Sequence, residues 1–244
     1  MGVVDKIRDA GVVGAGGAGF PTHVKAAGKA EIVLANGAEC EPLLRVDRLM
    51  MQRYPELVVK GLKAVMEATG AQSGVICLKK HYHDAITALE KAIAGEPNIR
   101  LYPMESYYPA GDEQQIVYEV IGKVVPTGGI PLDVGAVVSN VSTLINIANA
   151  LEGQPVVDKV VTVGGEVGRP VTLKVPIGTP YRLLIEAAGG PKSLDGYTIV
   201  VGGPATGKLS NDWDEPVTKT TGGLLVFPSD HPLIQKKTDQ QEVD

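Results

Sequence analysis

Glycine is concentrated near the N-terminus, in a stretch whose composition suits a bound cofactor. Five of the nine residues from 11 to 19 are glycine, which leaves a bare backbone that can lie against a flat or anionic ligand. Pro21 suits the first turn of a helix, so the free N–H groups of that helix would face the glycine loop. Lys25 lies one turn further on and adds a positive charge. The stretch therefore predicts a site for a phosphorylated cofactor.

The same glycines match the dinucleotide-binding fingerprint in form. Gly14, Gly16 and Gly19 have its G-x-G-x-x-G spacing. The fingerprint carries weight when it follows a strand and opens a helix within one βαβ unit. Here residues 3–10 are expected to form a short helix, and residues 12–13 are barely long enough for a strand. We therefore expect a cofactor loop of a different type, with a structural turn that binds nothing as the alternative.

A second glycine-rich stretch, residues 202–208, has the G-x-x-x-x-G-K form of a P-loop. Leu209 follows the lysine, at the position where a P-loop has the hydroxyl that binds Mg²⁺. Pro204 also makes a helix there unfavourable. We interpret this stretch as a turn.

The composition is that of a globular protein and excludes several classes of function. The chain has 244 residues, 44% of them hydrophobic, and no apolar run long enough to span a bilayer. The net charge of −5, with scattered lysines and arginines, argues against a nucleic-acid partner. Two cysteines cannot form a four-ligand iron–sulfur or zinc site within one chain. We expect reduced thiols, no metal site and a cytoplasmic location.

The hydrophobic pattern predicts an α/β fold followed by a smaller domain. Expected strands at 31–36, 74–79, 99–102 and 135–139 alternate with expected helices at 55–69, 83–94, 113–121 and 140–151. Such alternation is typical of a mainly parallel, Rossmann-like sheet, which we assign to residues 1–154. A hairpin at 159–175, a helix at 179–188 and strands near 198–201, 208 and 223–227 predict a β-grasp-like domain over 155–234. Residues 235–244 are expected to be a polar, disordered tail.

Four segments in order carry a family resemblance. They are residues 14–25, Asn36–Pro42, Tyr108–Glu113 and Ser139–Thr143. The set resembles the flavin-binding domain shared by the RnfC proteins of the Rnf electron-transport complex, the PduS-type cobalamin reductases and the PrdC protein. It is similar, more distantly, to the 51-kDa flavin subunit of respiratory complex I. Residues 161–167 and 175–180 resemble the soluble-ligand-binding β-grasp (SLBB) module, so the resemblance covers roughly residues 3–235.

The resemblance implies an FMN-dependent module that oxidises NADH, with Glu39 and Glu113 as the catalytic carboxylates. A carboxylate beside the nicotinamide would favour the positive charge that the ring acquires as hydride leaves. The glycines would form the slot for the flavin ring, Phe20 would stack near the nicotinamide or adenine, and the acidic residues would line the NADH side. The full set of residues implied to bind FMN or NADH is Gly14, Gly16, Gly17, Gly19, Phe20, Lys25, Asn36, Glu39, Glu41, Gly111, Asp112, Glu113, Ser139, Asn140 and Thr143. Lys25, Asn36, Ser139, Asn140 and Thr143 would hold the polar parts and the phosphate.

Longer members of the family carry cysteine-rich cluster motifs after the β-grasp region, and no such motif occurs in this chain. Any 4Fe-4S clusters are therefore expected on a further C-terminal region or on a partner. The expected partner is an iron–sulfur, ferredoxin or cobalamin acceptor protein, with attachment to the cytoplasmic face of a membrane complex as one possibility. Two alternatives stay open at this point: a non-catalytic ligand-binding or assembly module, and a plain Rossmann NAD enzyme. The sequence fits both the RnfC branch and the cobalamin-reductase branch of the family.

Overall fold

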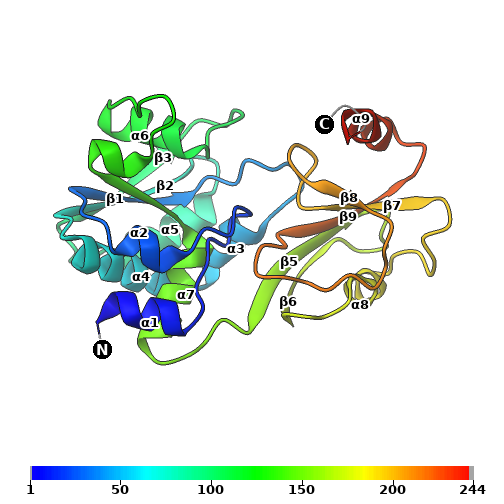
Figure 1. Cartoon of the computed structure of the whole chain (residues 1–244), viewed down its shortest axis with the longest axis horizontal. Helices are drawn as coiled ribbons and strands as arrows, with labels where there is room; N and C mark the ends of the chain where they lie inside the picture. The colour runs from blue at the N-terminus through cyan, green and yellow to red at the C-terminus, as the bar shows by residue number, and fades with distance from the viewer. Residues whose placement is uncertain (1, 242–244) are drawn as a thin grey trace. The chain divides into compact units, whose positions relative to one another are not determined.

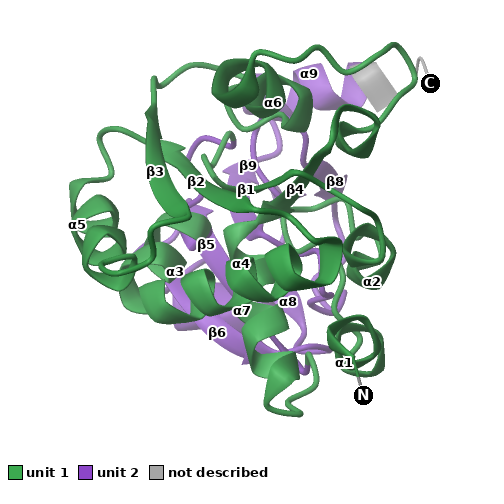
Figure 2. Ribbon diagram, turned by 90° about the vertical axis from the view of Figure 1, so that its left-hand side faces the viewer, with its two compact units in different colours: residues 1–40, 47–156 green, residues 41–46, 157–244 purple. Residues whose placement is uncertain are grey.

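The computed structural model describes residues 2–241 and divides into two compact units. The first unit comprises residues 1–40 and 47–156, and the second comprises residues 41–46 and 157–244 (Figure 2). The second unit therefore includes a short segment that closely follows the first strand and that the sequence pattern groups with the first domain. Residues 242–244 of the predicted tail lie outside the described residues.

The first unit is built on a four-stranded parallel sheet in the order β3-β2-β1-β4; β1, β2 and β3 are labelled in Figure 1, and all four strands in Figure 2. Its strands are β1 (Ile32–Gly37), β2 (Ser73–Lys79), β3 (Ile99–Met104) and β4 (Ala136–Asn140). Its helices are α1 (Val3–Asp9), α2 (Thr22–Ala26), α3 (Val46–Arg53), α4 (Pro55–Thr69), α5 (His83–Ala92), α6 (Glu113–Ile121), the 3-10 helix η1 (Pro131–Val134) and α7 (Val141–Leu151). The predicted α/β fold with a parallel sheet is confirmed.

Alternate residues of the strands face two separate cores. Val33 and Ala35 of β1 pack with α1, α4, α5 and α7, whereas Leu34 packs with α6 on the opposite face. Side chains alternate in direction along a strand, so a strand covered on both faces must be apolar throughout. Helices therefore cover both faces of the sheet, which leaves the strand ends and their loops as the place for polar chemistry.

Close helix packing beneath the sheet depends on one glycine. A Cβ at Gly61 of α4 would lie 2.0 Å from the carbonyl oxygen of Leu144 in α7. No side chain larger than hydrogen fits there, so Gly61 lets the two backbones approach. Because α7 begins at the end of β4, this packing also holds the N-terminus of α7 in place.

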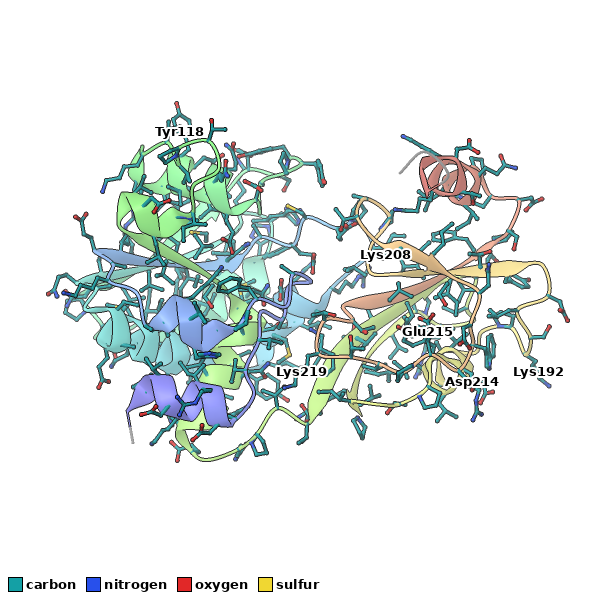
Figure 3. The ribbon with its side chains drawn as sticks, viewed as in Figure 1. Tyr118, Lys192, Lys208, Asp214, Glu215 and Lys219 are labelled. Carbon is teal, nitrogen blue, oxygen red and sulfur yellow. The ribbon has the colours of Figure 1, made fainter. Side chains whose placement is uncertain are left out.

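The second unit is a five-stranded sheet in the order β6-β5-β9-β7-β8. Its elements are β5 (Asp158–Gly165), β6 (Val171–Pro176), α8 (Tyr181–Ala187), β7 (Tyr197–Val201), β8 (Lys208–Ser210), β9 (Gly223–Pro228) and α9 (Pro232–Gln241). β5 and β6 form the expected antiparallel hairpin, and β9 pairs parallel to β5 and antiparallel to β7. Lys208, the lysine of the P-loop-like stretch, is exposed at the start of β8 (Figure 3), which confirms the turn interpretation.

Two segments differ from the sequence-based expectation. The tail predicted to be disordered from residue 235 instead forms most of α9 within the described residues. The sequence pattern does not predict α3, because its polar sequence has only a weak apolar face. This helix contributes a buried acid, Asp47, to the candidate site.

Candidate cofactor site

The predicted site residues gather where the parallel strands end. β1 lies between β2 and β4, so the chain leaves β1 toward one side of the sheet and returns at β4 on the other. In open α/β sheets, ligands bind at the carboxyl ends of the strands beside such a switch point. Asn36 at the end of β1 is the direct register partner of Asn140 at the end of β4, and Ala35 pairs with the buried Ser139. The topology thus places two of the predicted binding segments side by side.

The glycine loop is closed on itself and connected to α7. The N–H of Gly14 donates to the carbonyl oxygen of Phe20 at 2.9 Å. The N–H of Gly19 donates to the carbonyl oxygen of Gly14 at 3.2 Å. The N–H of Ala15 donates to Oγ1 of Thr143 at 2.9 Å. Pro21 immediately precedes α2, which has only five residues. The loop is therefore held against the first turn of α7 as well as leading into a helix of its own.

Two glycines in the loop have different reasons to lack a side chain. A Cβ at Gly16 would lie 3.3 Å from Nδ2 of Asn140, so the bare face of Gly16 is turned toward that amide. Gly17 has φ +118°, which side chains rarely tolerate, and the space before it is open. An exposed backbone of this kind fits a flat ligand, and the adjacent α7 N-terminus fits an anion.

Asn140 caps α7. Its Oδ1 accepts hydrogen bonds from the N–H groups of Ser142 at 2.9 Å and Thr143 at 3.4 Å. Its Nδ2 donates to Oδ2 of Asp47 at 2.8 Å, and Oγ of Ser142 donates to Oδ1 of the same carboxylate at 2.9 Å. Asp47 lies in α3 and was missed by the sequence analysis, because no local pattern connects an acid to a helix almost a hundred residues later.

Lys25 and Glu113, predicted to serve the phosphate and the NADH side respectively, form an ion pair. Nζ of Lys25 lies 2.6 Å from Oε1 of Glu113 and donates to the carbonyl of Val138 at 3.0 Å. The same Nζ lies 5.8 Å from the centre of the Phe20 ring, and Phe20 is 45% exposed. The cation therefore stands between the glycine loop, the end of β4 and the start of α6.

The loops after β1 and β3 meet at Gly111. Nδ2 of Asn36 donates to the carbonyl of Gly111 at 2.8 Å, while Oδ1 of Asn36 accepts from the N–H of Ala38 at 3.1 Å. The N–H of Gly111 in turn donates to Sγ of Cys40 at 2.9 Å. A Cβ at Gly111 would lie 2.2 Å from the carbonyl oxygen of Ala38, so this junction requires glycine.

Cys40 is part of that junction, a role that the sequence did not indicate. Burial raises the pKa of its thiol, and the hydrogen bond from Gly111 opposes the rise. Cys77 in β2 is fully buried, and burial raises its pKa to about 12. Both cysteines are free thiols. Asp112, next to Gly111, caps α6 by accepting from the N–H groups of Gln114 and Gln115 at 2.9 and 3.1 Å.

The remaining two acids lie in different units. Glu39 is half-buried in the first unit, next to Cys40. Glu41 belongs to the second unit, where its carboxylate accepts from the N–H groups of Ala205 at 2.8 Å and Thr206 at 2.7 Å. The contacts given above connect the glycine loop, Lys25, Glu113 and the ends of β1 and β4. Glu41 is instead engaged at the turn between β7 and β8.

Neither a metal-binding cluster nor a membrane-spanning helix is found among the described residues. Residues 2–241 contain no group of three or more His, Cys, Asp or Glu arranged to hold a metal ion. No helix in that range is long and apolar enough to cross a membrane.

A parallel α/β domain with a glycine loop held on a helix N-terminus, followed by a small sheet domain, defines a class of cofactor-binding proteins. Residues 7–149 match the family described as the Nuo51 FMN-binding domain, and residues 160–208 match the SLBB domain. The chain belongs to the Nuo51 FMN-binding domain family and carries an SLBB domain, as the sequence resemblance predicted.

Characterised relatives agree with this assignment. The chain is 47% identical over 238 residues to the cobalamin reductase PduS of Salmonella typhimurium, covering 97% of this chain and 52% of the relative. It is 40% identical over 234 residues to a subunit of the Na⁺-translocating ferredoxin:NAD⁺ oxidoreductase complex of Acetobacterium woodii, covering 93% and 53%. A chain of an NAD⁺-reducing nickel–iron hydrogenase superposes with a TM-score of 0.80 at 25% identity, covering 93% of this chain and 46% of that one. The chain thus spans about half the length of these relatives.

Proposed function

We propose that this chain binds FMN at the strand ends of its first unit, oxidises NADH there, and passes the electrons to an iron–sulfur, ferredoxin or cobalamin partner. The observation that carries the proposal is the connection of the glycine loop to the N-terminus of α7 through Ala15 and Thr143, with the Lys25 cation beside the end of β4. A bare backbone, a helix N-terminus and a cation are the parts that a phosphorylated flavin needs. The NADH donor is supported by the relatives' names, which include an NAD⁺ oxidoreductase.

FMN, when bound, accepts electrons in a pair and releases them singly. Lys25, Asn140 and Thr143 are proposed to hold its phosphate, and Asn36 and Ser139 its other polar groups. Gly14, Gly16, Gly17 and Gly19 would leave room for the ring. The charge on Lys25 is shared with Glu113 in the structure, so a phosphate would have to compete with that carboxylate.

Glu39 and Glu113 are proposed to act on the nicotinamide side. A carboxylate favours positive charge that develops nearby, and more so where water is excluded. The Glu113 side chain is 43% exposed and forms an ion pair with Lys25. Its carboxylate would act more strongly on the nicotinamide if Lys25 turned away to bind the phosphate. Phe20 is proposed as the stacking surface for the nucleotide, since its ring remains half-exposed at the loop. Gly111 and Asp112 would shape the loop that brings Glu113 to the site.

The acceptor, the location and the involvement of Glu41 are further parts of the proposal. A cytoplasmic protein that joins a larger electron-transfer assembly is supported by the relatives, one of which is named as a subunit of an oxidoreductase complex. Iron–sulfur clusters are proposed to reside on a partner or on a further region. Glu41 is proposed as a further acid for the nucleotide, although in the structure its carboxylate accepts from the N–H groups of Ala205 and Thr206.

Reconstitution with FMN, followed by anaerobic addition of NADH, tests the proposal. We expect one FMN per chain and bleaching of the oxidised-flavin absorption by NADH. Iron should be absent after anaerobic purification. Failure to bind FMN would refute the proposal, whereas binding without bleaching would favour the alternative of a non-catalytic assembly module.

A further inference from the structure

Asp47 occupies an unusual place for an acidic side chain. It is 8% exposed and lies in the first turn of α3. Its two oxygens accept from two side chains at the start of α7: Oδ2 from Nδ2 of Asn140 at 2.8 Å, and Oδ1 from Oγ of Ser142 at 2.9 Å. Burying a carboxylate is costly unless donors compensate it, so this arrangement implies a specific role.

The chemistry of the carboxylate decides how the Asn140 amide is oriented. An ionised carboxylate only accepts hydrogen bonds, so Asn140 must direct its NH₂ toward Asp47. Its carbonyl oxygen is then directed to α7, where it accepts from the N–H groups of Ser142 and Thr143. The opposite amide orientation, similar in shape, would place an NH₂ against those N–H donors and leave the helix without its cap.

The orientation of Asn140 extends to the glycine loop. Nδ2 of Asn140 lies 3.3 Å from the position that a Gly16 Cβ would take. The N–H of Thr143 donates to Oδ1 of Asn140, and the hydroxyl oxygen of Thr143 accepts a hydrogen bond from the N–H of Ala15. Through Asn140, Asp47 therefore acts on the start of α7, which is proposed to meet the phosphate, and on the glycine loop, which is proposed to face the ring.

We propose that Asp47 is a positioning residue that sets the affinity for the phosphorylated flavin by fixing the orientation of the Asn140 amide. This inference rests on the proposed FMN site. An acid in the first turn of any helix interacts favourably with the helix dipole. The role proposed for Asp47 is different, because it depends on the hydrogen bond to Asn140. Asp84 lies in the first turn of α5, with an exposed side chain whose carboxylate lies 4.0 Å from the guanidinium of Arg48, and so provides a control for the loss of a first-turn acid that faces solvent.

The test compares Asp47→Asn, Ser142→Ala and Asp84→Asn with the wild type, by titration with FMN and with riboflavin. Asp47→Asn keeps the shape but removes the charge and one of the two acceptors, so that Asn140 and Ser142 can no longer both donate to the side chain at position 47. We expect the FMN dissociation constant to rise about tenfold, the size of one lost hydrogen bond to a charged group, with a clearly smaller rise for riboflavin. Ser142→Ala should shift the FMN value in the same direction but less, because the contact to Asn140 remains. Asp84→Asn should change neither.

A second readout needs no flavin. The side-chain NH₂ signals of Asn140 in ¹⁵N–¹H spectra should show slow hydrogen exchange in the wild type and fast exchange in Asp47→Asn. Equal losses for FMN and riboflavin, or an FMN affinity equal to that of Asp84→Asn, would overturn the inference. So would unchanged Asn140 exchange. If Asp47→Asn does not fold, a Ser142→Ala variant with unaltered FMN selectivity has the same consequence. A wild type that binds no FMN would refute the proposed function itself.

Discussion

Replacing Gly111 by alanine tests whether the loops after β1 and β3 form one unit. A Cβ there would lie 2.2 Å from the carbonyl oxygen of Ala38 and 2.9 Å from Sγ of Cys40. Ordinary contact needs more than 3.4 Å, so the two loops must separate by about 1 Å, in a fold whose packed interior resists such shifts. Gly111 does not have a positive φ, so the substitution adds no backbone strain of its own.

The cost follows from the contacts that such a separation breaks. Asn36 to Gly111 at 2.8 Å and Gly111 to Cys40 at 2.9 Å are the two hydrogen bonds at risk. Their loss costs about 1–3 kcal/mol together, and relieving the overlap about 1–3 kcal/mol more. Because Asn36 is a proposed ligand of the flavin, we also expect the FMN dissociation constant to rise about ten- to a hundredfold.

Urea unfolding and FMN titration measure the two effects. Gly222→Ala is the control, since a Cβ there meets only Leu44 at an ordinary 3.7 Å. Cys40→Ala removes one acceptor without adding bulk, and should cost less than Gly111→Ala in both measurements. A Gly111→Ala protein with wild-type stability and wild-type FMN affinity would show that the junction positions nothing, and would refute the reasoning.

Three further outcomes are expected at the same site. Lys25→Ala should weaken FMN binding about 10- to 150-fold and riboflavin binding much less, because riboflavin lacks the phosphate; equal losses in a titration would place Lys25 away from the phosphate. Glu113→Gln should strengthen FMN binding, since it removes the carboxylate that pairs with Lys25, while it slows flavin bleaching by NADH in stopped-flow; weaker FMN binding would contradict this. Because burial raises the pKa of Cys40, its thiolate is scarce at neutral pH and iodoacetamide labelling should still accelerate above pH ~9; a rate that levels off below that pH would be evidence against a raised pKa.

Most helices and strands of the first unit, α3 excepted, could be predicted because their signals are local. α4 begins at Pro55 and ends before Gly70, which has the left-handed φ of +77° that a helix end favours. α6 also has the predicted bounds, Glu113–Ile121, since Asp112 supplies the cap and Gly122 the end. β1, β2 and β4 are mostly apolar and buried on both faces, as a parallel sheet between two layers of helices requires, whereas the edge strand β3 includes the exposed Arg100.

The partners of the site residues could not be predicted in the same way. Lys25 is predicted to serve the FMN phosphate and Glu113 the NADH side, yet their side chains meet at 2.6 Å. Asp47 and Asn140 are 93 positions apart in the chain. Such pairs depend on how whole helices and strands pack, and the local sequence around one member does not identify the other. The glycine loop was found because its unusual feature, a bare backbone, is contained in a few consecutive residues.

The C-terminal helix α9 is an element for which the composition gives a wrong prediction. Residues 235–241 are all polar, and their mean hydropathy predicts disorder. Docking of a helix depends on one face alone, and two residues three positions apart supply it: Ile234, 4% exposed, and Lys237, 8% exposed. Nζ of Lys237 donates to the carbonyl of Gly207 at 2.7 Å, while Ile234 packs with Val200 and Leu225. One apolar side chain and one hydrogen-bonded cation thus account for the docking of a helix that the average composition would leave unfolded.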